Sequence, residues 1–353
     1  MQRIFAVFGL LILALAAAWS VRLAQADAAV REGTPQGIAR ALDHTPGNTA
    51  YIAMAALDSD KPEPMLERIV ELTPRVSAPR IRLGLAAEQR GDFAVAERVL
   101  RDAYAVDHQF ETRWTLANFY LRQGRADDFW TWMRSALDFS YGDRRAAFDL
   151  CWQISSDPQE ILARAIPNRA DVAADYLQYL VEHQKTDALA AAAQNVRNPD
   201  LLLPAVDQLL EQSRYDDAVQ VWRFAGRTGP MGIVAPNFEA PQSGLGFDWR
   251  RIRSEGVRHP FPGRIELTGK QAESVELLRQ IVGGLEPGVR YKLQWKSSVE
   301  VPGVEWRVNG VALTEFDADA PSAVVSLWYN RPIGEMRAEA SFDLSGILLL
   351  PLH

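Results

Sequence analysis

The chain has 353 residues, of which 48% are hydrophobic and 24% are charged. This balance is that of an ordinary globular protein, and the length is sufficient for two domains. A formal net charge of −7 argues against a nucleic-acid-binding protein, which needs a basic face to neutralise phosphates. The single cysteine, Cys151, excludes an intramolecular disulfide and a cysteine-based metal site.

An uncharged, mostly apolar run covers residues 4–21 and is bounded by Arg3 and Arg22. As a helix this run would be about 27 Å long, close to the thickness of the hydrocarbon core of a membrane. We therefore expect residues 1–29 to form an uncleaved signal anchor that crosses the membrane through residues 4–21 and continues as a helical stalk. The alternative is a signal peptide cleaved near Ala26, where small residues provide a cleavage site. In both cases the rest of the chain is exported.

An internal repeat covers residues 82–107 and 115–140, with a constant offset of 33 residues. Within each copy, apolar residues fall at helical spacing, and Gly91 aligns with Gly124 where one helix must end and the next begin. The first helix carries large and small residues, the turn a glycine, and the second helix small and aromatic residues. This pattern resembles the tetratricopeptide repeat, although the period here is one residue shorter than that of the family.

Weaker copies flank this pair. Residues 48–57 with 63–72 predict an earlier helix pair, and residues 174–196 and 202–226 predict two later ones. We expect about five helical hairpins between residues 35 and 226, stacked as an all-α, tetratricopeptide-like solenoid over residues 30–228, because a single hairpin cannot bury its own apolar face.

Aromatic residues are dense in the second copy, and most of them are expected in the core between repeats. Trp130 and Trp132 are two residues apart and cannot share one helical face. One of the two is therefore expected to face a groove or a neighbouring domain, which makes the pair the candidate partner-binding residues. The run over 141–149 is expected to be a solvated loop followed by a helix start.

The amino-acid composition changes at residues 229–236, where glycines and prolines indicate a linker. Beyond it the apolar period becomes two: residues 289–295 and 304–308 alternate, and Asn309-Gly310 is a strong hairpin signal. Several short strands over residues 237–353 predict an all-β antiparallel sandwich. Further strands are expected at 264–269, 274–282, 323–330, 335–344 and 347–352.

This part resembles jelly-roll domains of the galactose-binding or carbohydrate-binding-module type, many of which begin with Asn-x-x-Phe-Glu or a near variant. Here the matching residues are Asn237-Phe238-Glu239, Gly246–Trp249 and the turn and strand over Pro287–Leu293. Many such modules hold a structural calcium with an acidic residue in the last strand. Residues 347–353 carry no acid, so calcium is not predicted.

Sugar-binding members of that type expose aromatic rings, and the candidates here are Trp249, Trp328 and Tyr329. Trp328 and Tyr329 are adjacent, so one of them must face outward from a strand. Phe247 and Trp249 are two apart, so in a strand they would share one face. We interpret residues 237–251 mainly as the entry strand of the new domain, with these aromatics in its core.

The sequence carries few signs of catalysis. None of the five histidines is paired at metal-ligand spacing, and there is no P-loop, no nucleophile elbow and no dinucleotide fingerprint. The pairs Asp127-Asp128 and Asp216-Asp217 stand at helix starts, where carboxylates cap the helix and interact with its dipole. The prediction is therefore a protein that is not an enzyme, with no cofactor, no metal and no catalytic residues.

Together these features predict a membrane-anchored scaffold that binds protein partners through helical repeats. The combination resembles accessory proteins of bacterial exopolysaccharide, capsule or O-antigen machinery, which implies a polysaccharide as a further partner. It also implies a single-pass protein of the bacterial inner membrane with most of the chain in the periplasm, or a secreted protein after cleavage near Ala26. The alternative function is a carbohydrate-binding protein whose C-terminal sandwich binds glycan while the solenoid is a spacer.

Overall fold

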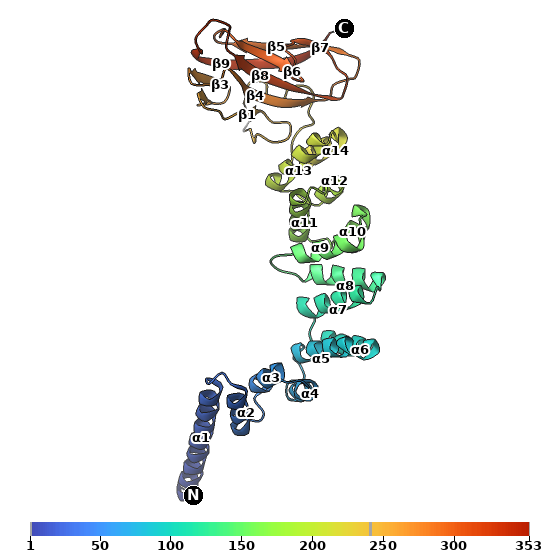
Figure 1. Cartoon of the computed structure of the whole chain (residues 1–353), viewed down its shortest axis with the longest axis vertical. Helices are drawn as coiled ribbons and strands as arrows, with labels where there is room; N and C mark the ends of the chain where they lie inside the picture. The colour runs from blue at the N-terminus through green and yellow to red at the C-terminus, as the bar shows by residue number, and fades with distance from the viewer. Residues whose placement is uncertain (1, 240–241, 353) are drawn as a thin grey trace. The chain divides into compact units, whose positions relative to one another are not determined.

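A computed structural model describes residues 2–239 and 242–352 of the chain, helical in its first two thirds and built of β-strands in the remainder (Figure 1). The fold divides into two compact units. The first contains the residues up to Ile154 together with Ala163–Pro167, and the second contains Ser155–Leu162 and the residues from Asn168 onward.

The helices follow one another with short connections. They are α1 (Gln2–Val30), α2 (Pro35–His44), α3 (Thr49–Leu57), α4 (Glu63–Leu72), α5 (Ala78–Gln89), α6 (Phe93–Val106), α7 (Phe110–Arg122), α8 (Ala126–Asp138), α9 (Arg145–Ile154), α10 (Pro158–Arg164), α11 (Ala170–Glu182), α12 (Thr186–Ala193), α13 (Pro199–Glu211) and α14 (Tyr215–Phe224).

The predicted hairpins are present as α3–α4, α5–α6, α7–α8, α11–α12 and α13–α14. Each of the last four reverses through one residue with positive φ at the same place in the turn. Gly91 and Gly124 occupy it at φ 85° and 68°, as the aligned glycines predict. Gln184 and Ser213 hold the same position in the two later hairpins, at φ 53° and 57°. The turn geometry is thus the same in the two hairpins that have no glycine at this position.

Two short helices, α2 and α10, are not predicted individually by the sequence. Both begin with a proline, at Pro35 and Pro158, and α10 has only seven residues. The seven residues of α10 are too few to show a clear apolar periodicity. The helix start expected within 141–149 is found at Arg145.

Helix α1 is long and apolar enough over Val7–Val30, by length and composition, to cross a membrane, with a mean hydropathy of 2.1 in an 18-residue window. Its last turns pack onto α2, where Ala26 and Ala29 are buried in a cluster with Ala41. Gly37 permits this approach, because a Cβ there would lie 2.3 Å from the carbonyl oxygen of Ala29. The helix therefore runs without a break from its apolar segment into the packing of the first helical pair.

The strands form two antiparallel sheets, with orders β1-β4-β8-β6 and β2-β3-β9-β5-β7. Buried side chains from both sheets make up one apolar cluster, which includes Trp306 and Phe342. The strands are β1 (Arg250–Arg251), β2 (Val257–Arg258), β3 (Arg264–Thr268), β4 (Ser274–Gly283), β5 (Arg290–Ser297), β6 (Val304–Val308), β7 (Glu315–Asp317), β8 (Ser322–Asn330) and β9 (Glu339–Leu352).

The predicted strands at 264–269, 274–282, 289–295, 304–308 and 323–330 are found as β3, β4, β5, β6 and β8. The prediction of two separate strands over 335–344 and 347–352 is wrong, because β9 is one strand of 14 residues. Gly346 lies within it at φ 57°, opposite a register shift in β5. A local irregularity, and not a turn, therefore separates the two apolar runs of β9.

The prediction of an entry strand over 237–251 is also wrong, although residues 240 and 241 lie outside the described residues. The segment before β1 consists of turns, and Gly246 has φ 59°. Phe247 and Trp249 consequently do not share a face. Phe247 contacts Trp222 of α14 with ring centroids 5.4 Å apart, whereas Trp249 lies in the cluster between the sheets, 6.2 Å from Trp306.

Residues 229–236, predicted as a linker, lie within the second unit and are held there by hydrogen bonds to β4. Gly232 pairs with Gly283 of β4, and Val234 exchanges two hydrogen bonds with the buried amide of Gln280, at 3.1 and 2.9 Å. Fixed contacts thus hold this connection against the four-stranded sheet.

Candidate functional site

The hairpins α5–α6 and α7–α8 carry different chemistry at their two ends. The end that holds the tight turns is charged, and the opposite end is aromatic. We call the first the charged network, which comprises Glu97, Arg101, Tyr120, Arg125 and Asp128. We call the second the aromatic cluster, which comprises Tyr104, His108, Arg113, Trp132 and Phe139.

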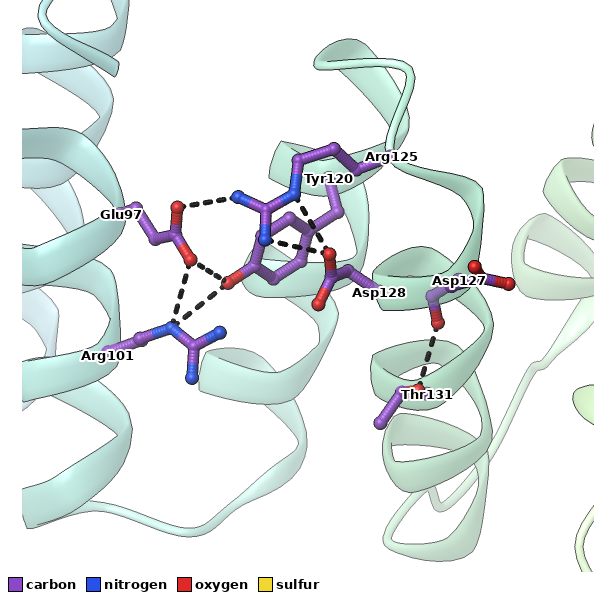
Figure 2. A network of polar contacts seen from close by, with 7 residues as sticks. All are labelled: Glu97, Arg101, Tyr120, Arg125, Asp127, Asp128 and Thr131. Carbon is purple, nitrogen blue, oxygen red and sulfur yellow. Dashed lines mark hydrogen bonds and ion pairs between the residues drawn. The ribbon is translucent and has the colours of Figure 1, made fainter. Parts of the chain in front are cut away.

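In the charged network, the Glu97 carboxylate of α6 is the acceptor for three side chains (Figure 2). It accepts hydrogen bonds from the Tyr120 hydroxyl at 2.7 Å, from Arg125 at 2.7 Å and from Arg101 at 3.2 Å. Arg125 also donates to Asp128 at 2.9 Å, and its guanidinium lies 4.6 Å from the centre of the Tyr120 ring. Three consecutive helices, α6, α7 and α8, are joined in this way.

The pKa values in the network follow from these contacts. Burial, together with the hydrogen bond to Glu97, raises the pKa of Tyr120 to about 12, so the hydroxyl is protonated at neutral pH. Burial alone would raise the pKa of Glu97, but hydrogen bonds from Tyr120 and Arg125 outweigh it and lower the pKa below its usual range. The charges of two carboxylates thus neutralise those of two guanidiniums, and the network links neighbouring repeats to one another.

The aromatic cluster lies at the other end of the same helices. The Tyr104 ring is 4.5 Å from His108 and 4.8 Å, edge to face, from Trp132. The Arg113 guanidinium lies 5.3 Å from the centre of the Tyr104 ring and 3.5 Å from that of Phe139, and its Nε donates to Ser135 at 2.8 Å.

Several rings of this cluster reach the surface. Tyr104 and Trp132 are half-buried, while His108 and Phe139 are exposed. Arg113 is buried beneath them and holds two rings in place by cation–π contact. Partly exposed aromatic side chains on a rigid support are what a protein-binding surface needs, because they offer large contact area at low entropic cost.

The two predicted partner-binding residues lie in different environments. Trp130 is buried, packs against Phe129 with ring centroids 5.0 Å apart, and lies below Arg164. Trp132 is half-buried and belongs to the aromatic cluster. The helical periodicity thus separates the two rings, and Trp132 is the one that reaches the surface.

The three predicted ligand-binding residues are also separated. Trp249 is 1% exposed and Tyr329 is 0% exposed, so neither ring is available at the surface. The Tyr329 hydroxyl accepts a hydrogen bond from the backbone of Ala338 at 2.9 Å. Trp328 is half-buried on the outer face of β8, as the alternation of a strand requires, with Arg307 4.6 Å from its ring centre.

Trp295 is not among the predicted ligand-binding residues, but it is 39% exposed at a cavity of about 430 Å³ between the ends of the two sheets. Alternation places it on the same side of β5 as Tyr291 and Leu293, and a register shift lies at this position, between Gln294 and Lys296. It lies 5.9 Å from Trp306, which also lines the cavity. Such a bulge has no clear sequence signal.

Within the described part of the chain, no three His, Cys, Asp or Glu side chains gather where they could hold a metal ion.

No protein-family model and no curated protein matches the chain. Among solved structures, it is similar to a chain of the APC/C hetero-tetramer Cut9–Hcn1, at 12% identity over 55% of this chain and 37% of that chain, with a TM-score of 0.26. YrrB, described as a TPR protein with an unusual peptide-binding site, matches at 8% identity over 55% of this chain and 94% of its own, with a TM-score of 0.28. Yeast Tom70 matches at 13% identity over 54% and 45%, with a TM-score of 0.31.

The chain spans less than half of the Cut9–Hcn1 and Tom70 chains that it matches. Because these TM-scores are low, the architecture rests on the helices, turns and strands themselves.

Proposed function

We propose that the protein is a non-enzymatic, membrane-anchored scaffold that binds protein partners through its helical hairpins. The aromatic cluster is the observation that carries this proposal. An array of stacked hairpins offers a rigid, extended surface, and here half-exposed rings gather on it around a buried arginine. The charged network at the other end fixes α6, α7 and α8 relative to one another, so the rings are presented in a fixed arrangement.

The test is partner capture from solubilised cell envelopes with the full chain, comparing Trp132→Ala with Phe93→Ala. Phe93 is also an aromatic residue of these two hairpins. It lies at the start of α6, at the end away from the aromatic cluster, and is 49% exposed. Partners that are held by the wild type and by Phe93→Ala, but lost with Trp132→Ala, would support the proposal. Equal capture by the wild type and both variants would show that the aromatic cluster is not part of the binding surface.

The anchor is proposed to remain uncleaved. Cleavage near Ala26 would cut α1 where Ala26 and Ala29 pack against α2 and where the Tyr51 hydroxyl donates to the Asp27 carboxylate. It would thus remove part of the packing of the first helical pair. The mass of the protein purified from membranes should be that of the full chain, and a product that begins after Ala26 would overturn this part of the proposal.

The location proposed is the bacterial inner membrane, with the bulk of the chain in the periplasm, and the role is that of an accessory in cell-surface polysaccharide assembly or export. Arg3, before the apolar run, favours a cytoplasmic start, and Arg22 after the run weakens this bias. A C-terminal reporter that is active only in the periplasm tests the orientation. Loss of surface polysaccharide in a deletion strain, restored by the wild-type chain, tests the role.

The C-terminal domain is proposed to be a sandwich of the jelly-roll type. Its first long strands, β3 and β4, pair with the last two, β9 and β8, and the two pairs belong to different sheets. Such pairing of early with late strands across two sheets is characteristic of Greek-key and jelly-roll chains. A solved structure of the domain tests the assignment.

Carbohydrate binding by this domain is the second candidate function, and Trp295 at the mouth of its cavity is the observation that favours it. Polysaccharide pull-down with the full chain should then be weakened by Trp295→Ala but not by Trp328→Ala, whose ring lies on the outer face of β8. Equal retention by both variants would count against this site.

A further inference from the structure

A second cavity of the β-strand domain, of about 370 Å³, lies beside β1 and β2. It shares no lining residue with the cavity at Trp295. The residues that define it include two arginines, a histidine and a buried tryptophan. Its lining includes Gln242, Ser243, Trp249, Arg251, Arg253 and His259.

Strand alternation explains why two arginines meet there. Residues 250–252 are extended, because β1 pairs with β4 and the Ile252 amide continues the ladder to the carbonyl of Leu277 at 3.1 Å. Arg250 extends toward α13, where it pairs with Asp207 at 2.6 Å. Arg251 and Arg253, at alternate positions, both line the cavity.

Among the described residues, no carboxylate pairs with the two arginines of the cavity. None of the described residues that line it is acidic, and within the described ranges neither Arg251 nor Arg253 takes part in an ion pair. Neighbouring arginines differ in this respect: Arg250 is paired with Asp207, and Arg279 lies 3.6 Å from Glu276. Two guanidiniums at one cavity without a carboxylate favour an anion from outside.

The remaining walls define how such an anion would sit. The His259 Nε2 lies 3.3 Å from the carbonyl of Ile252, which fits a neutral ring donating that hydrogen bond. Burial, with a further contribution from Arg251, lowers the pKa of His259, so the arginines supply the charge. The buried ring of Trp249 is held by a hydrogen bond from its Nε1 to Ala235 at 3.2 Å and contributes an apolar wall.

We propose that this cavity binds a small ligand that carries an oxyanion, held by Arg251 and Arg253. A planar guanidinium can donate two parallel hydrogen bonds to a carboxylate or to a phosphate, so the two groups share one recognition chemistry. The volume suits a ligand about the size of one acidic sugar residue. The site lies in the second compact unit and does not depend on the partner-binding role of Trp132.

Titration calorimetry of the full chain in detergent micelles at low salt tests the proposal with three probes: glucuronate, glucose 6-phosphate and glucose. We expect at least one of the two acids to bind, and glucose to bind at least tenfold more weakly. The first acid as the preferred ligand would identify a carboxylate site, and the second a phosphate site. Equal binding of glucose, or no binding of either acid, would overturn the proposal.

The variant R251Q/R253Q should weaken binding of the preferred acid at least tenfold. R258Q is the matched control, because Arg258 is an exposed arginine of β2 that does not line the cavity. It removes the same type of charge from the same segment and should change the affinity less than twofold. An equal loss with R258Q would indicate only a diffuse effect of charge and would overturn the site. The single variants R251Q and R253Q, checked by circular dichroism, separate lost binding from lost folding.

Discussion

Tyr120 and Tyr51 each donate a hydroxyl hydrogen bond to a carboxylate, but their surroundings differ. Tyr120 is fully buried between helices and bonds to Glu97, whereas Tyr51 bonds to Asp27 at a more exposed place. Removing a buried hydroxyl also leaves part of its partner's hydrogen-bonding capacity unused, and that cost is small where water can replace it.

We therefore expect Tyr120→Phe to lower the free energy of unfolding by about 1.5–3 kcal/mol, the range for a hydrogen bond to a charged group. Tyr51→Phe should have a smaller effect. Urea unfolding of the full chain in detergent, followed by helical circular dichroism, compares the two. A larger loss for Tyr51→Phe would contradict the structural role given to the charged network.

Cys151 provides a second prediction for single residues. It is fully buried on α9, and burial raises the pKa of its thiol to about 12. Because the thiolate is the reactive form, the native thiol should react with an aromatic disulfide reagent at least about 100-fold more slowly than the thiol of the urea-unfolded chain. The reaction should stay slow up to pH 9, since ionisation begins only near the raised pKa. Fast labelling of the native chain at pH 8 would show that α9 is not packed as described.

At the scale of elements, secondary structure is predicted best from the sequence where local backbone geometry and long-range packing favour the same conformation. The turns at Gly91 and Gly124 are predictable because a helix end needs positive φ and glycine adopts it at low cost. The positions of Gln184 and Ser213 are predictable only from the surrounding repeat. The segment before β1 is mispredicted because its two-residue aromatic spacing fits a strand, while Gly246 lies so close to Trp222 that no Cβ fits, and the chain turns there instead.

The contact between α13 and β1 has no sequence signal, because Asp207 and Arg250 are 43 residues apart. Asp207 accepts hydrogen bonds from Arg250 and from the amide of Gly246, each at 2.6 Å. Burial raises the pKa of this carboxyl, and Arg250 partly opposes the rise. The pair thus joins the last helical hairpin to the four-stranded sheet through a largely desolvated carboxylate.

Arg250→Ala should lower the free energy of unfolding by about 2–4 kcal/mol at pH 7, because it leaves that carboxylate buried without its partner. The folded-state pKa of Asp207 is raised above its unfolded value. The cost of ionisation is therefore present at neutral pH and is relieved as the pH falls through the raised pKa. The stability deficit of the variant should accordingly shrink on acidification.

Two further variants make this prediction specific. Asp207→Asn in the Arg250→Ala background should recover part of the loss and abolish its pH dependence, since no buried charge remains. Arg264→Gln is the matched control. Its ion pairs are long, at 3.8 and 3.9 Å, and exposed, so it should cost less than about 1 kcal/mol. Denaturant unfolding at pH 7 and pH 5 measures all of these. A deficit in Arg250→Ala that does not change with pH would rule out the buried carboxylate as its cause.

At the scale of the whole molecule, composition shifts predict a boundary between the helical and the β-strand part at residues 229–236. The structure describes a second compact unit that contains α11–α14 and the strands together. Its internal contacts include Tyr215 with the backbone of Gly284, and Phe247 with Trp222. Composition marks where the type of secondary structure changes. It does not reveal whether apolar surface continues across that change, because this depends on which rings meet after folding.

This continuity leads to a prediction about fragments. A fragment of residues 168–353 keeps α13, α14 and both sheets, and should unfold in one cooperative thermal transition. A fragment of residues 233–353 exposes the face of Phe247 and leaves Arg250 without Asp207. It should therefore melt at a lower temperature, or aggregate. Circular dichroism melts and size-exclusion chromatography of the two fragments provide the measurement. If the shorter fragment melts as cooperatively and at the same temperature as the longer one, the β-strand domain is independent of the last helical hairpin, and the contacts of Asp207, Tyr215 and Trp222 contribute no stability to it.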